Sequence, residues 1–378
     1  MTRTPAAGCY RIRPFPHSIA DTGPVHPAKD ASIAVPVELA ALLASPPFVG
    51  KAEVSRCRGV LERDCDFAVA VPVRDEERRL PATLDALSAA MRAVPFAGCA
   101  VFVINDTSDV SADVIERWAV RERQSFLALE VSFDPTIRNA PHARRLALDI
   151  AARAVSRGAL FTTDADTIVG KTWIDTGLRF LAEGYDLVCE DVLLDEQELA
   201  ALPAQVREVG DAERDYLDLC ERLWRYWTYG RAGTLGYRPS GASLAMKGSS
   251  YLALGGLPTP VVGEDRALCD AMIGAGFAVK AMENYGTRTS ARLNGRASGG
   301  CGDALADRAT SADPECDSRL KPVWLLHDEA TLWIEIIGGA SRGFHAIPKS
   351  GGTMTFSAVQ RELKIARKLA TTYGLADA

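Results

Sequence analysis

Carboxylate side chains follow three apolar runs of this 378-residue chain. The acidic segments are Arg74-Asp-Glu-Glu77, Asn105-Asp-Thr-Ser-Asp109 and Asp164-Ala-Asp166. Carboxylates that gather at one place repel each other unless a positive charge lies among them. Divalent cations such as Mg²⁺ and Mn²⁺ prefer oxygen ligands and also bind phosphate. The pattern therefore predicts Mg²⁺ or Mn²⁺ together with a phosphate-containing ligand, if the fold brings the three segments to one cleft.

The apolar runs that precede these segments are typical of strands buried on both faces of a parallel sheet. They comprise residues 67–73, 99–104 and 159–163, and a further run covers residues 127–133. Helical patterns lie between the runs, at about 81–93, 111–124 and 141–156. This alternation predicts a doubly wound α/β layer. Because ligands bind beyond the carboxyl ends of the strands in such sheets, the acidic segments are expected at the binding edge.

Composition narrows the class of protein. Hydrophobic residues make up 47% and the formal charge is −6, so electrostatic binding of nucleic acid is not expected. No run approaches the roughly 18 apolar residues of a membrane span, and the first 16 residues lack the apolar run of a secretory signal. The nine cysteines contain no C-x-x-C pair, which favours a reducing, cytoplasmic location.

Three regions are expected along the chain. Residues 1–65 are rich in proline and are interpreted as an N-terminal extension with one helical patch at 37–43. Residues 66–285 contain the strand–helix alternation and form the predicted catalytic domain. Residues 286–378 are expected to contribute a loop and a C-terminal helical region, including an amphipathic helix at 358–373, that complete the active site.

Six short segments, in order, resemble motifs of the family 2 glycosyltransferases. Val71-Pro-Val-Arg-Asp-Glu-Glu77 resembles their opening strand and loop, and Ile104-Asn-Asp-Thr-Ser-Asp109 resembles their D-D-x-S-x-D loop. The other four segments are Asn139-Ala-Pro-His-Ala-Arg-Arg145, Thr163-Asp-Ala-Asp-Thr167, the stretch from Gly241 to Pro258, and Gly263-Glu-Asp265. The resemblance covers about residues 66–285. It departs from the family where Arg74-Asp75 replaces an aromatic-Asn pair and where Asn105 replaces an acid.

The resemblance implies a GT-A-like mixed sheet flanked by helices, and a metal-dependent transfer of a sugar from a nucleoside diphosphate to an acceptor hydroxyl. Asp166 would bind the metal directly, and Asp164 would hold the ribose or a metal-bound water. His327, which follows a short apolar run, would complete the metal shell, as a late histidine does in many relatives. The absence of a Q-x-x-R-W motif and of membrane helices argues against a processive polysaccharide synthase.

The resemblance also assigns the residues that contact the donor. Pro72, Val73, Arg74 and Glu76 are expected to line the nucleoside pocket, and Asp106 is expected to accept a hydrogen bond from the base. Arg144 would reach the donor phosphates or fix the acidic loop at Asp164. UDP is the preferred nucleotide by family frequency, and GDP is the alternative.

Asp265 is the candidate general base for an inverting transfer, and Glu264 would orient the acceptor or the base. Acids in the first turn of a helix also have a purely structural explanation, since they interact favourably with the helix dipole. The acceptor is expected to be a sugar, a lipid-linked molecule or another small molecule. The glycine-rich segment 289–302 carries Arg292 and Arg296, and it is expected to form a flexible loop that closes over the diphosphate.

Two other functions remain open at this point. A sugar nucleotidyltransferase would share the nucleotide layer and the acidic metal ligands, but it would normally carry a glycine-rich loop after the first strand, and residues 74–79 contain no glycine. A non-catalytic sugar-nucleotide-binding protein is the second alternative. A dehydrogenase with a dinucleotide-binding fold is disfavoured, because no G-x-G-x-x-G follows the first strand.

Overall fold

The computed structural model describes residues 37–61, 65–155, 158–232, 235, 239–296, 299–337 and 352–375. The chain divides into residues 1–34 and a unit of residues 35–378, and every described residue belongs to the second unit. Most of the expected N-terminal extension, residues 1–36, lies outside the described residues. Among the helices described here, none is long and apolar enough to cross a membrane.

The main sheet contains parallel and antiparallel pairs. Its strands are β1 (Ala52–Val60), β2 (Phe67–Val73), β3 (Gly98–Asn105), β4 (Phe126–Phe133), β5 (Ala159–Thr162), β7 (Leu187–Glu190), β9 (Leu244–Lys247) and β10 (Val279–Met282). Their order across the sheet is β1-β4-β3-β2-β5-β9-β7-β10. The strands β2, β3, β4 and β5 run parallel, whereas β9 is antiparallel to β5 and β7, and β1 is antiparallel to β4. The predicted mixed α/β class is therefore confirmed.

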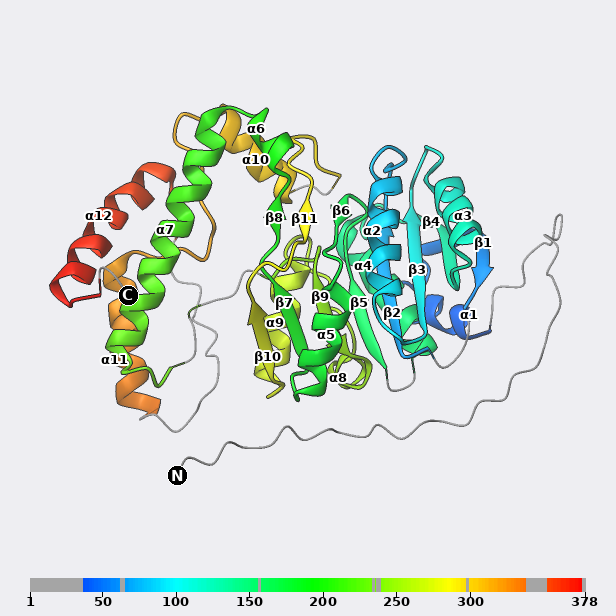
Figure 1. Cartoon of the computed structure of the whole chain (residues 1–378), viewed down its shortest axis with the longest axis horizontal. Coiled ribbons are helices and arrows are strands. Elements are labelled where there is room, and N and C mark those ends of the chain that lie inside the picture. The colour runs from blue at the N-terminus through cyan, green and yellow to red at the C-terminus, as the bar shows by residue number, and fades with distance from the viewer. Residues whose placement is uncertain are drawn as a thin grey trace, which may run out of the picture. The chain divides into compact units, whose positions relative to one another are not determined.

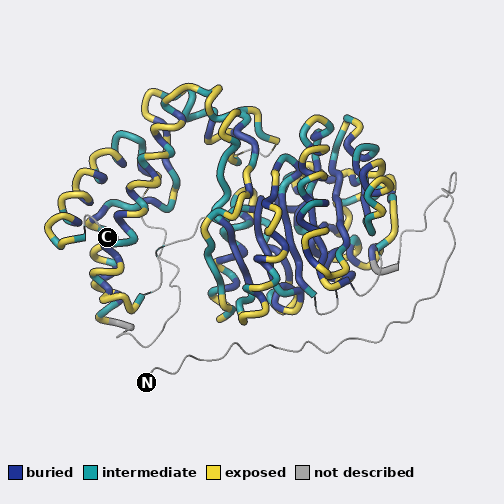
Figure 2. Tube along the Cα trace, viewed as in Figure 1, coloured by how far each residue is buried: buried dark blue, intermediate teal, exposed yellow. Residues whose placement is uncertain are grey.

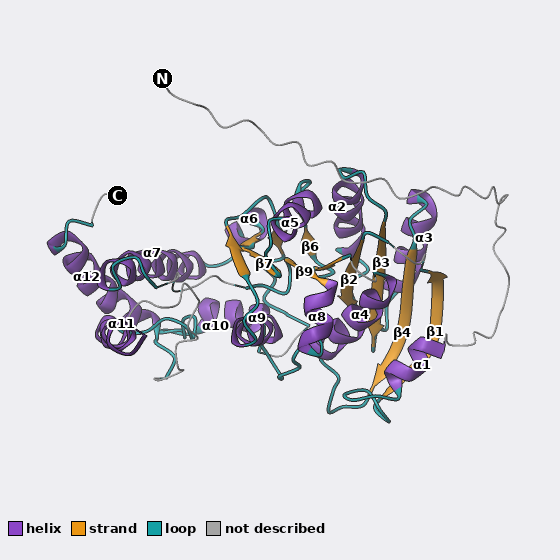
Figure 3. Cartoon of the chain, turned by 90° about the horizontal axis from the view of Figure 1, so that it is seen from below, coloured by secondary structure: helices purple, strands orange, loops and turns teal. Residues whose placement is uncertain are grey.

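Helices cover both faces of this sheet (Figure 3). One face carries α2 (Leu80–Arg92), α3 (Ser111–Glu122) and α5 (Trp173–Ala182), and the other carries α4 (Ala140–Ala154), α8 (Gly248–Leu254) and α9 (Glu264–Gly274). Alternate side chains of β2 point to opposite faces of the sheet. Phe67 and Val69 pack with the first set of helices, and Ala68 and Ala70 pack with the second. The central strands are consequently buried along their length (Figure 2). Such strands give the continuous apolar runs seen in the sequence.

A separate group of helices lies to one side of the main sheet, on the left of Figure 1. The long helix α7 (Ala204–Trp227) packs with α11 (Val323–Ile337) and α12 (Phe356–Thr372) around a third apolar cluster. The predicted terminal helix at 358–373 corresponds to α12. Between the two regions lie α6 (Glu196–Ala200), α10 (Cys301–Thr310) and a small sheet of β6 (Thr167–Ile168), β11 (Arg288–Thr289) and β8 (Leu193–Leu194). The patch at Val37–Leu43 forms α1.

The strand β1 was not foreseen from the sequence. It lies within the stretch interpreted as an extension, yet it pairs with β4 from Ala52 to Val60. As an edge strand it is largely open to solvent, and Cys57 is its one fully buried side chain. It therefore lacks the apolar run that marks a central strand. The sheet thus begins 14 residues earlier than the expected boundary at residue 66.

Candidate active site

A cleft of about 1230 Å³ lies at the carboxyl ends of β2 and β5. One wall comes from the strand ends and the first turn of α9, and the facing wall comes from α7, α10 and residues 315–319. The sequence-predicted residues that line this cleft are Pro72, Val73, Arg74, Glu76, Arg144, Asp164, Asp166, Glu264 and Asp265. Asp106 and His327 do not line it. The fold therefore brings most of the predicted site together, although these residues are spread over four segments of the chain.

Two loops at one end of the cleft are joined by acidic side chains. The carboxylate of Asp75 accepts hydrogen bonds from the Ser108 amide (2.8 Å) and hydroxyl (3.1 Å). The carboxylate of Asp109 accepts from the Glu77 amide at 2.9 Å and from the Ser111 amide, also at 2.9 Å, at the start of α3. These contacts satisfy backbone donors that a loop would otherwise leave to water. The acids Asp75 and Asp109 therefore shape the pocket rim rather than point into it.

The two acids after β5 differ in their surroundings. The Asp166 side chain is only 13% exposed, whereas that of Asp164 is 34% exposed. Burial raises the pKa of Asp166 to about 7, and the charge of Asp164 adds to this rise, while Arg292 opposes it. A carboxylate with this environment gains more from a nearby cation than an exposed one does.

Arg144 links the acidic loop after β5 to the first turn of α9. Its side chain is 3% exposed, and its guanidinium pairs with Asp164 at 2.5 Å and with Glu264 at 3.1 Å. It also donates to the Thr162 hydroxyl (2.9 Å) and to the Gly241 carbonyl (2.7 Å). Burial opposes the charge of this group, but Asp164 and Glu264 raise the pKa of Arg144 so that it stays protonated. Arg144 therefore fixes the acidic loop, which was one of its two predicted roles.

The neighbouring Arg145 has a structural role that the sequence did not reveal. Its guanidinium donates to the carbonyls of Leu257 and Gly255, each at 2.6 Å, and to Asp149 at 2.6 Å. These carbonyls belong to the loop that follows α8. The helix α4 therefore presents Arg144 to the cleft and holds a supporting loop with Arg145.

The first turn of α9 presents Glu264 and Asp265 to the cleft. Gly263, with φ of 80°, adopts a left-handed conformation that starts the helix at this point. The carboxylate of Asp265 accepts from the Gly241 amide at 3.0 Å and from the Arg266 amide at 2.7 Å. Burial raises the pKa of Glu264, Arg144 opposes the rise, and the charge of Asp265 adds to it. Both acids are thus held in fixed orientations beside Arg144.

The glycine-rich segment packs onto the acidic residues of the strand ends. Arg292 makes two hydrogen bonds to the Glu76 carboxylate, one of them at 2.8 Å, and its guanidinium lies 3.0 Å from Asp166. Arg296 donates to the Asp75 carbonyl at 3.0 Å. Both arginines line the cleft. In this structure Arg292 contacts acidic side chains of the protein, whereas Arg296 is hydrogen-bonded to a backbone carbonyl.

Asp106 lies beside the cleft, with its carboxylate turned toward the end of β4. It accepts from the Phe133 amide at 3.4 Å and pairs with Arg138 at 3.2 Å. Its neighbour Asn105 lines the cleft instead, and the Asn105 amide donates to Asp106 at 3.3 Å. The structure therefore does not place Asp106 on the wall where a nucleobase is expected.

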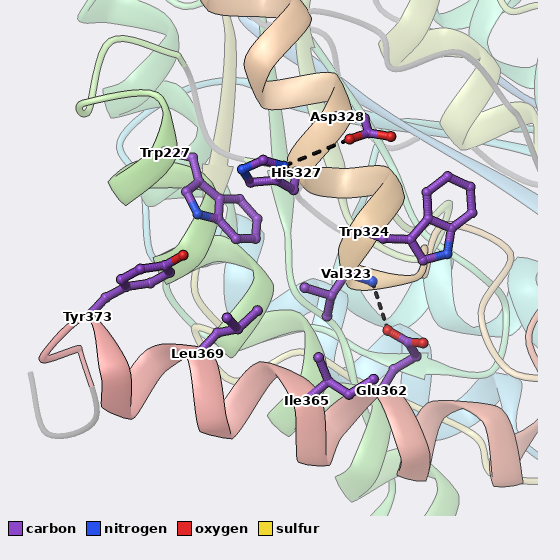
Figure 4. Close-up of a pocket in the computed structure, with 9 residues that line it drawn as sticks. All are labelled: Trp227, Val323, Trp324, His327, Asp328, Glu362, Ile365, Leu369 and Tyr373. Atoms are coloured by element: carbon purple, nitrogen blue, oxygen red, sulfur yellow. Dashed lines mark hydrogen bonds and ion pairs between the residues drawn. The ribbon is translucent and has the colours of Figure 1, made fainter.

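His327 lies in a different pocket, of about 290 Å³, among α7, α11 and α12 (Figure 4). Its ring stands edge-on to Trp227 with 5.0 Å between the centroids, and its Nδ1 lies 3.8 Å from Asp328. Trp324 and Tyr373 line the same pocket. The structure therefore does not bring His327 together with Asp164 and Asp166, and its position gives no support to the predicted role as a metal ligand.

The wall of the cleft that faces the strand ends was missed by the sequence analysis. Arg308 of α10 makes two 2.9 Å hydrogen bonds to the buried Glu213 of α7, and Glu213 also accepts from the Asp317 amide at 2.8 Å. Arg207 and Arg214 of α7 line the same wall. One signal was available, because Glu213 falls on the apolar face of α7, where an unpaired charge would be costly.

The donor atoms around Asp166 suit a hard cation. Among the described residues, no three His, Cys, Asp or Glu side chains are grouped as a complete metal site. Magnesium, however, is commonly held by one or two carboxylates and completes its shell with phosphate oxygens and water. Asp164 and Asp166 provide such a pair on the cleft wall. Their oxygen chemistry therefore fits a divalent cation that arrives with a phosphate ligand.

Comparison with known proteins gives distant structural similarity. No family model matches the sequence, and no curated protein matches it. Among solved structures, the chain is similar to the mannosyltransferase PcManGT from Pyrobaculum calidifontis in complex with GDP-Man and Mn²⁺, with 14% identity, 83% of this chain and 77% of that chain covered, and a TM-score of 0.43. It is also similar to TarS 1-349 from S. aureus in complex with UDP-GlcNAc, with 13% identity, coverage of 71% and 66%, and a TM-score of 0.41.

A third similar structure is glucosyl-3-phosphoglycerate synthase from Mycobacterium tuberculosis in complex with Mn²⁺, UDP and glucosyl-3-phosphoglycerate. It has 14% identity, coverage of 65% of this chain and 78% of that chain, and a TM-score of 0.39. With scores and identities at this level, the function of the chain has to be argued from its own residues.

Proposed function

We propose that this chain is a metal-dependent glycosyltransferase of the GT-A type. It would move a sugar from a nucleoside-diphosphate donor to an acceptor hydroxyl, with inversion at the anomeric carbon. The observation that carries the proposal is the placement of Asp166 and Asp265 on one cleft, with Arg144 pairing to the acid beside each of them. Such a cleft offers a cation-binding end and a carboxylate end within one cavity.

The cation-binding end would hold the donor. Pro72, Val73 and Arg74 form the wall for the nucleoside, and Asn105 supplies an amide beside them. Asp166 and Asp164 would hold Mg²⁺ or Mn²⁺, which would offset the charge that builds on the departing nucleoside diphosphate. Arg292 and Arg296 lie at the same end and provide donors for phosphate oxygens.

The carboxylate end would activate the acceptor. Asp265 receives two backbone amide hydrogen bonds, which fix its orientation and leave lone pairs on both oxygens for an acceptor hydroxyl. It would take the hydroxyl proton as the oxygen attacks the anomeric carbon. Glu264, held by Arg144, would keep the first turn of α9 in place.

UDP is the nucleotide that we propose, with GDP as the alternative, because the resemblance to family 2 glycosyltransferases favours them in that order. The acceptor would enter between α9 and the wall formed by α7 and α10, since those elements border the end of the cleft away from the nucleoside wall. A sugar, a lipid-linked molecule or another small molecule remains the proposed acceptor class.

The test compares nucleotide binding by the wild type with that of Asp166→Asn. UDP, GDP and ADP are titrated calorimetrically with and without Mn²⁺. We expect the wild type to bind UDP or GDP at least 10-fold more tightly with Mn²⁺, and the variant to lose this gain because an amide is a poorer ligand for a hard cation. Asp211→Asn is the matched control, since Asp211 is an exposed acid that lines the same cleft on α7.

Three outcomes are decisive. Metal-dependent binding that survives in Asp166→Asn contradicts the assignment of the metal site. Release of pyrophosphate from a nucleoside triphosphate and a sugar phosphate would identify a nucleotidyltransferase instead. Nucleotide binding without turnover of any UDP- or GDP-sugar, across a panel of acceptors, would point to a non-catalytic binding protein.

A further inference from the structure

Arg292 pairs with two acids at one end of the cleft. Its guanidinium lies 3.0 Å from an Asp166 oxygen and is bonded in a bidentate manner to Glu76. The three side chains are well shielded, with exposures of 17% for Arg292, 13% for Asp166 and 6% for Glu76. Ion pairs in such surroundings are weakly screened by water and salt. The pairing is therefore strong enough to compete with another cation.

A divalent ion and Arg292 require the same carboxylate. An ion at Asp166 would be repelled by a guanidinium that still contacts that oxygen, so both cannot hold it together. We propose that Arg292 occupies the cation position of the free protein and must leave Asp166 before a divalent cation binds there. This inference rests on the proposed function of the site. It predicts that the free protein has a low affinity for metal and that Arg292 sets this affinity.

The contacts of Arg292 make its release feasible. The nitrogen that contacts Asp166, Nη2, is shared with Glu76, but the Nη1 hydrogen bond to Glu76 at 2.8 Å is independent of Asp166. This bond can persist when Nη2 turns away, so the charge does not become unpaired in a buried place. An incoming diphosphate would supply new acceptors for the freed donors. Metal and nucleotide should therefore bind with positive coupling, each favouring the other.

The experiment measures Mn²⁺ binding in the absence of nucleotide, through the electron paramagnetic resonance signal of free Mn²⁺. We expect the Mn²⁺ dissociation constant of Arg292→Ala to be at least 10-fold lower than that of the wild type. The double variant Arg292→Ala with Asp166→Asn should lose this gain. Arg292→Gln, which removes the charge and keeps hydrogen-bonding capacity toward Glu76, should also bind Mn²⁺ more tightly.

Arg308→Ala is the matched control. Arg308 lines the same cleft and pairs with Glu213, and the exposures of that pair, 16% and 5%, closely match the 17% and 6% of Arg292 and Glu76. It makes no ion pair with Asp166 among the described residues. We therefore expect its Mn²⁺ affinity to equal that of the wild type, so a gain in Arg292→Ala cannot come from removal of any buried arginine.

The results separate this inference from the proposed function. If neither Arg292→Ala nor Arg292→Gln binds Mn²⁺ more tightly, the competition is disproved, even if the wild type binds UDP in a metal-dependent way. An equal gain in Arg308→Ala would also overturn it, because the effect would then be general electrostatics. If the Arg292 variants gain Mn²⁺ affinity while no form binds a nucleotide, the competition stands and the glycosyltransferase assignment is wrong.

Discussion

Replacing Arg144 by methionine tests whether the two ends of the cleft depend on one buried cation. Methionine keeps a long side chain but leaves Asp164 and Glu264 without their shared partner. Breaking a buried ion pair in this way costs about 3–5 kcal/mol, because a charge remains in a poorly solvated place. The free energy of unfolding, measured by urea denaturation with tryptophan fluorescence at pH 8, should fall by about that amount.

The loss should shrink at lower pH. Burial already raises the pKa of Glu264, and the variant removes the opposing charge of Arg144. Between the unfolded pKa of about 4.3 and the raised folded pKa, the folded state binds a proton that the unfolded state releases. Stability therefore rises as the pH falls through this window, by at most about 1.4 kcal/mol per pH unit. We expect the variant to recover much of its loss between pH 8 and pH 5.

Arg58→Met is the control for this experiment. Arg58 is also shielded and bonded to three acids, but its partners Asp113 and Glu116 are about half exposed. Its replacement should cost about 1 kcal/mol, with no comparable recovery at pH 5. An Arg144→Met protein that loses as little as the control, or loses equally at both pH values, would refute the argument that Arg144 neutralises the buried Glu264 together with Asp164.

Two further changes have defined outcomes. Asp265→Asn should leave nucleotide affinity unchanged and lower the transfer rate by about 10²–10⁴-fold, which is the usual contribution of a general base. The rate is measured as product formation with the accepted donor. Transfer near the wild-type rate would show that the base lies elsewhere. Asp270→Asn, on the exposed side of α9, serves as its control. Gly241→Ala should lower the unfolding free energy by about 1–3 kcal/mol, because a Cβ there would lie 2.6 Å from Arg144. Gly210→Ala in α7 has open space and should raise the thermal midpoint slightly, so a similar response of both glycines would contradict the steric argument.

The sequence was most informative where burial is complete. The strands β2, β3, β4 and β5 lie in the middle of the sheet, so their apolar runs predicted them within a few residues. The edge strand β1 escaped because only one face of an edge strand meets the core, and polar residues fill the rest. An interior position alone was not sufficient, because the buried strand β9, which is only four residues long, was not predicted.

The residues of the candidate site were also predictable only in part. Acids at strand ends were predictable, since parallel strands bring their carboxyl ends to one edge. The partners of those acids were not, because Arg292 and Glu76 are 216 residues apart and nothing local indicates that they pair. For Asp106 the loop was predicted but the side-chain direction was not: its backbone is left-handed, with φ of 47°, and its carboxylate is turned toward the end of β4. Local spacing predicted the residue and its loop, but not the direction of the side chain.

The two walls of the cleft rest on different apolar clusters. The strand ends and α9 are supported by the clusters on the two faces of the main sheet, whereas α7 is supported by the cluster that it shares with α11 and α12. A substitution that repacks one wall therefore leaves the hydrophobic support of the other intact. Protein engineers can use this modularity, because a library confined to the exposed cleft-facing positions of α7, such as Arg207, Asp211 and Arg214, would vary what the pocket accepts without disturbing the machinery opposite.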